Sequence, residues 1–258
     1  MAFNEKFLIE TSSVPDLKNP KLVCGLPGSG FVGKLAVDYI IDKLHAKQFV
    51  DIYSSSFLPQ VTIQPDGTVD LIKNSLYYCK TGSHDLVLLT GDAQPVSPKS
   101  EYLLAEEIIN VCKKLHVDII YALAAYITGT FSKTPKVYGT STSLDLIQQF
   151  SKYEIQTMDR GSITGMNGVI IGVAKKLNMK GICLLGETSG YVIDAKASKA
   201  VLQVLSQMLD IKLDMTEFDK KVEDTEKIIK SIESQASREG YGQMTMPQPS
   251  NKNLEYIS

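Results

Sequence analysis

The sequence has no excess of charge of either sign. Its 258 residues include 27 Lys and Arg against 29 Asp and Glu, a formal net charge of −2 at pH 7. Proteins that bind nucleic acid through a broad surface usually carry a clear positive excess, so we expect no nucleic-acid partner. No stretch reaches the roughly 18 uninterrupted apolar residues of a membrane-spanning helix. Residues 1–6 lack the basic and apolar regions of a signal peptide. These absences predict a cytoplasmic protein without a membrane partner.

Cysteine and histidine are scarce. The four cysteines are scattered and include no C-x-x-C pair: Cys24, Cys79, Cys112 and Cys183. Buried free thiols in a reducing compartment are therefore favoured over a disulfide or a metal site. The three histidines show no metal-ligand spacing: His45, His84 and His116. The sequence predicts no metal and no cofactor.

Short apolar runs alternate with helical patterns over most of the chain. Apolar residues make up 43% and charged residues 22%, which is typical of a globular protein. Runs such as 21–26 and 85–90 are near-continuously apolar, as strands covered on both faces should be. Helical spacing follows them at 31–44 and 98–115. This alternation predicts an α/β domain, residues 1–213, with a mostly parallel sheet between helices on both faces.

An antiparallel hairpin interrupts this alternation. Residues 60–64 and 69–72 alternate apolar and polar side chains, and they flank Pro65-Asp66-Gly67-Thr68. An Asp-Gly pair between two alternating segments is a strong indication of a β-hairpin.

The composition changes after residue 213. Residues 214–239 are highly charged and predict an amphipathic helix with an apolar seam at Phe218, Val222, Thr225, Ile229, Ile232 and Ala236. The seam has two interpretations, packing on its own domain or pairing between subunits, and Thr225 and Ala236 argue against a strong zipper. Residues 240–258 have no periodicity and predict a flexible tail, although their end, residues 253–258, is apolar again.

The glycine motif Gly28-Ser-Gly30-Phe-Val-Gly33 follows a predicted strand and begins a predicted helix. This is the context of a dinucleotide-binding turn, whose helix N-terminus holds a phosphate. The acidic residue expected about 20 positions later is nearest at Asp51, inside a predicted strand. A tight strand-to-helix turn, where no side chain fits, explains three glycines equally well and is the favoured interpretation.

Two carboxylates, Asp92 and Glu187, both lie just past predicted apolar strands. Ligand clefts in open α/β sheets form outside the carboxyl ends of the strands, so an acid–base pair is one interpretation. A turn residue at Asp92 and a helix-capping or surface residue at Glu187 is the other. The segment around Gly165 and Gly168 leads into a helix, and it fits either an anion-binding turn or close helix–sheet packing.

Four motifs together resemble the proteasome assembly chaperone 2 family, and the likeness is closest to its archaeal members. They are C-G-L-P-G-S-G-F-V-G-K-L-A at 24–36, L-T-G-D-A-Q-P at 89–95 followed by Glu101 and Tyr102, G-M-N-G-V-I-I-G at 165–172, and L-L-G-E-T at 184–188 before Asp194. The resemblance implies a three-layer fold related to purine nucleoside phosphorylases, without an established catalytic role. It also implies a homo-oligomer that binds 20S proteasome α subunits or the α ring, aiding assembly or modulating the ring.

Family members bind the α subunits partly through extended C-terminal tails, and the resemblance thus implies that the tail residues Leu254, Tyr256, Ile257 and Ser258 make the contacts. The chain departs from the hydrophobic–Tyr–any ending of similar activators, because Tyr256 is third from the end and follows Glu255. That departure bears on gate opening more than on docking. The competing hypothesis is a nucleoside- or nucleotide-binding enzyme that uses the turn Gly28–Gly33 with Asp92 and Glu187.

Overall fold

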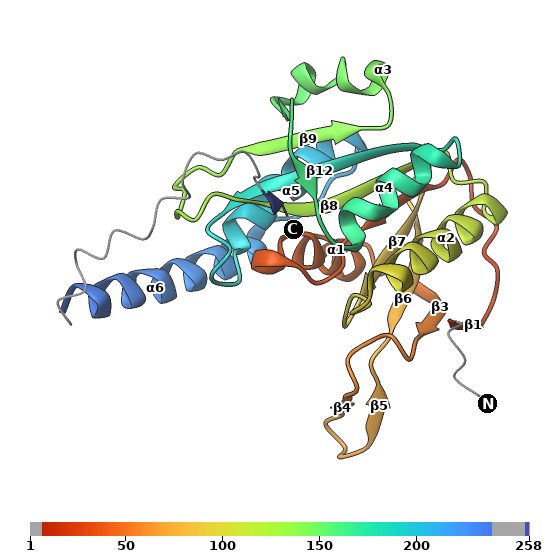
Figure 1. Ribbon diagram of the computed structural model, residues 1–258, viewed down its shortest axis with the longest axis horizontal. Helices are drawn as coiled ribbons and strands as arrows, with labels where there is room; N and C mark the ends of the chain where they lie inside the picture. The colour runs from red at the N-terminus through yellow and green to blue at the C-terminus, as the bar shows by residue number, and fades with distance from the viewer. Residues whose placement is uncertain (1–6, 239–255, 258) are drawn as a thin grey trace.

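The computed structural model describes residues 7–238 and 256–257, and it is built around one nine-stranded sheet (Figure 1). The strand order is β1-β3-β6-β7-β2-β8-β12-β9-β10. In chain order these strands are β1 (Leu8–Thr11), β2 (Lys21–Cys24), β3 (Lys47–Tyr53), β6 (Asn74–Lys80), β7 (Asp85–Gly91), β8 (Ile119–Ile127), β9 (Val137–Ser141), β10 (Gln156–Thr157) and β12 (Lys180–Thr188).

The centre of the sheet is parallel and its flanks are mixed. Strands β7, β2, β8 and β12 run parallel to one another. The pairs β1–β3, β3–β6, β6–β7 and β12–β9 are antiparallel, and β10 is parallel to β9. The predicted parallel sheet is therefore confirmed at its centre, where the continuously apolar runs lie, and antiparallel strands extend it on both sides.

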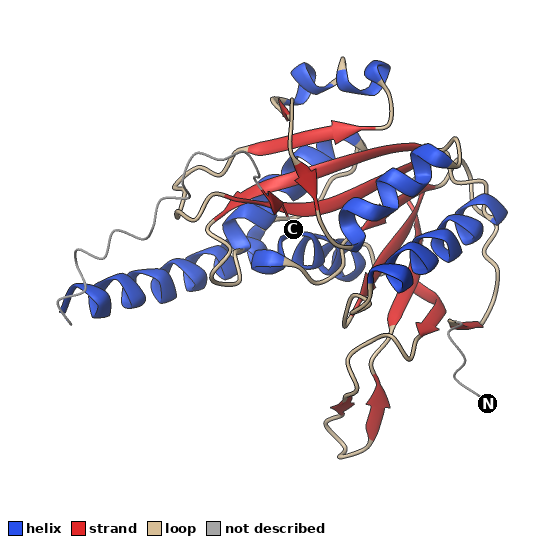
Figure 2. Cartoon of the chain, in the orientation of Figure 1, coloured by secondary structure: helices blue, strands red, loops and turns tan. Residues whose placement is uncertain are grey.

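Helices cover both faces of the sheet, which confirms the predicted three-layer α/β architecture (Figure 2). Helices α2 (Pro98–Lys114) and α4 (Met166–Lys176) pack on one face, while α1 (Val32–Lys43), α5 (Ala195–Met208) and α6 (Thr216–Arg238) lie on the other. Adjacent residues of β2 are fully buried in opposite layers, Leu22 towards α2 and α4 and Val23 towards α1 and α5. Burial on both faces is the reason that the central part of such strands is apolar at successive positions.

The predicted helix starts are confirmed by their caps. The side chain of Ser97 accepts a hydrogen bond from the Ser100 amide, and Pro98 occupies the first turn of α2. Asp194 accepts a hydrogen bond from the Ala197 amide at the start of α5. Both caps satisfy amide groups that a helix leaves unpaired at its N-terminus.

The predicted hairpin forms a separate ribbon of β4 (Val61–Ile63) and β5 (Val69–Leu71), which projects from the body of the molecule (Figure 1). The segment 144–153 is only partly α-helical. It gives the four-residue α3 (Leu144–Ile147) and the 3₁₀ turn η2 (Phe150–Tyr153).

Helix α6 begins on the core and then extends away from it (Figure 1). Phe218 is fully buried, and its ring lies edge-on to Tyr39 with the centroids 4.7 Å apart. Val222 is half-buried against the same apolar layer. The seam therefore begins by packing on its own domain, as one of the two interpretations predicted. The helix predicted at 214–239 therefore shares the core of the main domain at its start. Residue 239 and most of the predicted tail, residues 240–255 and 258, lie outside the described residues.

All four cysteines are buried and free, as predicted. Burial raises the pKa of Cys112 and of Cys183 to about 12. Within the described residues, no helix is long and apolar enough to cross a membrane. No group of three or more His, Cys, Asp and Glu side chains in the same part of the chain is arranged to hold a metal ion.

Candidate functional site

The glycine turn connects β2 to α1 through the short 3₁₀ turn η1 (Ser29–Phe31). Gly30 has a φ of 63°, a conformation that other residues rarely adopt. A Cβ atom on Gly33 would lie 2.2 Å from the carbonyl oxygen of Leu123 in β8. Gly28 differs, because its backbone is extended and an added Cβ would meet only ordinary contacts beyond 3.6 Å. Two of the three glycines are thus explained by local conformation and packing alone.

Two amide side chains fill the space beside this turn. Asn167 accepts a hydrogen bond from the Leu26 amide at 3.2 Å and donates one to the Leu26 carbonyl at 3.2 Å. Gln94 donates to the Pro27 carbonyl and accepts from the Met166 amide at 2.6 Å. A Cβ atom on Gly165 would lie 2.7 Å from the Gln94 Oε1 atom. Gln94 and Asn167 therefore bond to the backbone before the glycine turn, and Gln94 also bonds to the start of α4. These are the two places where an anion-binding turn was one interpretation of the sequence.

The start of α4 is therefore capped by the protein itself. Met166 is its first residue, and the amide of Met166 is one of the groups that a helix N-terminus leaves unpaired. Gln94 supplies the acceptor, from the loop after β7. An anion at this helix would have to displace the Gln94 amide. Close packing, the second interpretation for the segment around Gly165, accounts for what the structure contains here.

Asp194 joins the glycine turn to α5. Its carboxylate accepts hydrogen bonds from the Ala197 amide at 2.9 Å and from the Thr188 hydroxyl at 2.7 Å. Its own amide donates to the Gly30 carbonyl at 2.8 Å. Asp194 is 6% exposed, so all of these bonds are shielded from water. Asp194 thus connects the turn after β2 to the end of β12, through its backbone amide on one side and its carboxylate on the other.

The two candidate acid–base residues are not brought together. Asp92 follows β7 and Glu187 lies in β12, with β2 and β8 between these strands. At about 4.8 Å per strand, this places them about 14 Å apart. Each accepts a hydrogen bond from a neighbouring backbone amide at 3.0 Å, Asp92 from Lys73 and Glu187 from Lys136. Asp92 is exposed after β7, whereas Glu187 is half-buried within β12.

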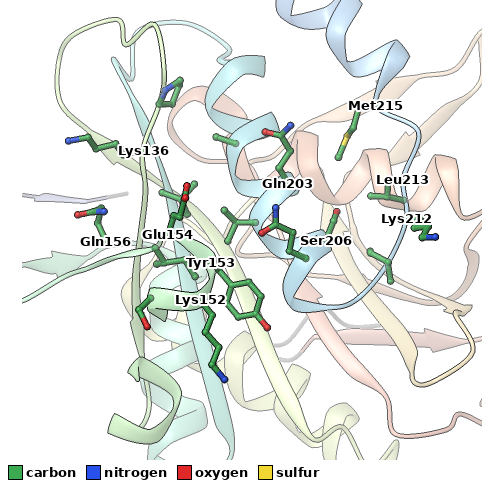
Figure 3. Close-up of a pocket in the computed structure, with 18 residues that line it drawn as sticks. Lys136, Lys152, Tyr153, Glu154, Gln156, Gln203, Ser206, Lys212, Leu213 and Met215 are labelled. Atoms are coloured by element: carbon green, nitrogen blue, oxygen red, sulfur yellow. The ribbon is translucent and has the colours of Figure 1, made fainter. Parts of the chain in front are cut away.

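A groove that the sequence did not indicate lies at the other side of the sheet, between the η2 turn, α5 and the segment that leads to α6 (Figure 3). Its volume is about 1220 Å³. Half-buried apolar side chains line it, among them Val204, Leu213 and Met215. Exposed Lys136, Lys152, Lys212 and Glu154 stand around it, as Figure 3 shows for these labelled residues. Small molecules usually bind in pockets that enclose most of their surface. A wide groove with mostly cationic groups around it is better suited to bind a segment of another protein.

Only part of the predicted tail site is described. Leu254 and Ser258 lie outside the described residues. Tyr256 and Ile257 form strand β13 (Tyr256–Ile257), which pairs in parallel with β11 (Ser162–Ile163) just before the Gly165 turn. Strand β13 lies against the central strand β8 (Figure 1). The end of the chain thus returns to its own core, a pairing of two short strands that no periodicity in the sequence indicated.

Known proteins are similar to this chain in sequence and fold over most of its length. The model of the PAC2 family matches residues 22–233. The crystal structure of PbaB from Pyrococcus furiosus, described as an archaeal proteasome activator, is similar with a TM-score of 0.83 and 34% identity, over 89% of this chain and 100% of that chain. PbaA from the same organism, described as an archaeal homologue of proteasome-assembly chaperone, has a TM-score of 0.73 and 25% identity, over 90% and 94% of the two chains.

A relative in Methanocaldococcus jannaschii, the uncharacterized protein MJ1210, is 32% identical over 249 residues, 96% of each chain. The matched region contains the glycine turn, Gln94, Asn167 and Asp194, and it ends within α6. On the family model and on this relative, the chain belongs to the PAC2 family.

Proposed function

We propose that the chain is a cytoplasmic proteasome assembly chaperone-like protein that acts by binding 20S proteasome α subunits or the α ring. The observation that carries this proposal is the similarity to PbaB, which extends over the whole of that chain at 34% identity. The glycine turn supports action by binding rather than by catalysis, because Gln94 and Asn167 occupy the space beside it and the candidate carboxylates Asp92 and Glu187 are far apart.

We assign the contact in part to the C-terminal tail. Leu254, Tyr256 and Ile257 supply apolar side chains, and Ser258 supplies a polar group beside them. Tails on a homo-oligomer engage several sites of one ring, which raises the effective concentration of each tail after the first has bound. Several weak contacts then give a stable complex.

The tail must leave its own core to bind in this way. Tyr256 and Ile257 pair through their backbones with Ser162 and Ile163. The same backbone groups cannot pair with β11 and with a partner at the same time. Binding to the α subunits therefore competes with the pairing of β13 and β11, and the free energy of that pairing is subtracted from the affinity of each tail.

The test is size-exclusion chromatography with light scattering, on the protein alone and mixed with recombinant α subunits from the same source. We expect co-elution of the full chain and weaker co-elution after deletion of residues 253–258, with an unchanged oligomer mass. Co-elution that survives the deletion would contradict the tail contact and move the interface to the core. No co-elution of the full chain at tens of micromolar would reject the proposed partner.

A thermal shift experiment separates binding from the enzyme hypothesis. A ligand that binds only the folded state raises Tm, by an amount that grows with the ratio of its concentration to its Kd. We expect no shift with nucleosides, nucleotides, NAD or phosphate at millimolar concentration. A clear rise in Tm with one of them, lost in the variant Gly28→Val, would favour the enzyme hypothesis.

A further inference from the structure

The projecting hairpin has one apolar face. The register pairs Val61 with Leu71 and Ile63 with Val69 across the two strands, so these four side chains lie on the same side of the ribbon. They are between 48% and 77% exposed, Ile63 most of all. Thr62 and Asp70 form the pair on the opposite side. Among the described residues, no element covers the apolar side, and a two-stranded ribbon by itself is only marginally stable in water.

An apolar cavity lies at the base of this ribbon. Its volume is about 470 Å³, and its lining includes Phe57, Leu58, Val61, Leu71 and Ile72. Phe57 and Ile72 are 4% exposed and form the floor, whereas Leu58 is 51% exposed at the rim. The exposed ribbon face and the cavity are continuous, because Val61 and Leu71 belong to both.

The charged groups of the hairpin are turned away from this face and are bonded locally. The Asp70 carboxylate accepts a hydrogen bond from the Gln64 amide group at 2.7 Å. The Asp66 carboxylate accepts two from Thr68, which lowers its pKa. A face without charge meets no like-charge repulsion from an identical face.

We propose that the apolar face of the hairpin binds the hairpin of a second copy of this chain, in an antiparallel arrangement about a two-fold axis. Val61 and Ile63 are two residues, about 7 Å, apart along the ribbon. Antiparallel packing therefore places the Ile63 side chain of each copy at the base cavity of the other. Such an interface is self-complementary, as two-fold symmetry requires.

The area fits this occupant. The four side chains and Leu58 present roughly 400 Å² of apolar surface, within the range of about 300–600 Å² for the largest patch of a typical monomer, which is often functional. Two such faces, with the walls of the two base cavities, bury about 1,000 Å² in total, which is what a specific interface requires. This inference goes beyond binding to the proteasome and does not depend on it.

The test measures the mass of the full chain by size-exclusion chromatography with light scattering at tens of micromolar. We expect Ile63→Asp to halve the mass of the wild-type particle, because it places a charge in the proposed contact. Thr62→Asp, on the opposite side of the same strand, should keep the wild-type mass. A monomeric wild type, or an Ile63→Asp particle of unchanged mass, would overturn the proposal. If Ile63→Asp keeps its mass but no longer co-elutes with α subunits, the face binds that partner and the second-copy assignment is wrong.

A cross-link provides a measurement that does not depend on the stability of Ile63→Asp. All four native cysteines are buried, so a cysteine introduced on the hairpin is the accessible thiol. Protein with Ile63→Cys, mixed with protein with Leu58→Cys and oxidised, should form a disulfide-linked dimer of the two chains. The mixture of Thr62→Cys with Leu58→Cys is the matched control. Equal cross-linking in both mixtures, or none in either, would overturn the proposed arrangement.

Discussion

Replacement of single glycines in the turn distinguishes close packing from phosphate binding. In Gly33→Ala the new Cβ would lie 2.2 Å from the carbonyl oxygen and 2.9 Å from the carbonyl carbon of Leu123. Non-bonded heavy atoms prefer about 3.5–4.0 Å, so α1 must move away from β8 by about 1 Å. Overpacking of this kind costs about 1–3 kcal/mol or more, and the opposing atoms are backbone atoms that cannot rotate away.

The helix preference of alanine offsets about 1 kcal/mol of this cost. We therefore expect Gly33→Ala to destabilise the fold by about 2 kcal/mol, which lowers Tm by about 4–8 °C in a domain of this size. Gly28→Ala is the matched control. Its nearest atoms would be 3.7 and 3.8 Å away, on Gln94 and Asn167. A glycine replaced without strain gains about 0.4–1 kcal/mol through the unfolded state, so Tm should rise slightly.

Differential scanning calorimetry or a dye-based melt measures both variants. A Gly33→Ala protein that melts at or above the wild-type temperature would refute the close approach of α1 to β8. A Gly28→Ala protein that melts well below the wild type would show a constraint on Gly28 that its extended backbone and open surroundings do not contain.

Three further changes test other parts of the fold. Asn167→Ala leaves the buried amide and carbonyl of Leu26 without partners and should lower the unfolding free energy by about 2–4 kcal/mol, measured by urea titration; an unchanged midpoint would contradict the bridge. Burial and Lys21 lower the pKa of His84 below its usual 6.5, so its contribution to stability is present above pH 6.5 and is lost as pH falls through the lowered value. The Tm of the wild type should therefore fall more between pH 7 and pH 5 than the Tm of His84→Gln. An equal fall in the two proteins would contradict this role of His84. Phe218→Ala removes the buried anchor of α6 and should lower the free energy that holds α6 on the core by about 3–5 kcal/mol. Hydrogen exchange in α6 should then be faster than in the wild type, while exchange in α2 stays the same. An unchanged exchange rate in α6 would show that Phe218 is not the anchor.

The central strands and the main helices could be predicted because each depends on a local pattern. A strand buried on both faces needs an apolar run, which residues 86–89 supply at the centre of β7. The caps at Ser97 and Asp194 are local as well, since each side chain bonds an amide three residues further on. The order of the strands is not local. The sequence places Asp92 and Glu187 at strand ends, but only the topology shows that two strands separate them.

The amide bridges illustrate the same limit. Asn167 and Gln94 lie within segments that the family resemblance covers, yet the partners of each are backbone atoms of residues 67 to 141 positions away. No spacing rule connects an asparagine with a backbone amide of another element. The groove of Figure 3 likewise forms from segments around residues 136, 153, 204 and 213, which only the packing brings together. The pairing of β11 with β13 joins two residues with two, too few for any periodicity.

The short pairing of the tail connects the two proposals. A contact of two residues on each strand contributes on the order of 1–3 kcal/mol, or about ten- to a hundredfold in affinity. A single tail that must first leave β11 therefore binds an α subunit weakly. Residues 239–255 join Arg238 to Tyr256, and 17 residues reach about 60 Å at most. That reach allows tails of one oligomer to occupy several sites of a ring, which gains about 10²–10⁴ in avidity and offsets the cost of releasing the tails.

Self-association through the hairpin then determines whether the tails can act together. We expect Ile63→Asp, with its tail intact, to lose most of its co-elution with the α ring, while Thr62→Asp keeps it. The deletion of residues 253–258 should have the opposite pattern, with the oligomer kept and the binding weakened. An Ile63→Asp protein that is half the mass of wild type and binds the ring with unchanged affinity would show that one tail is sufficient. In that case the pairing of β13 with β11 would be too weak to compete.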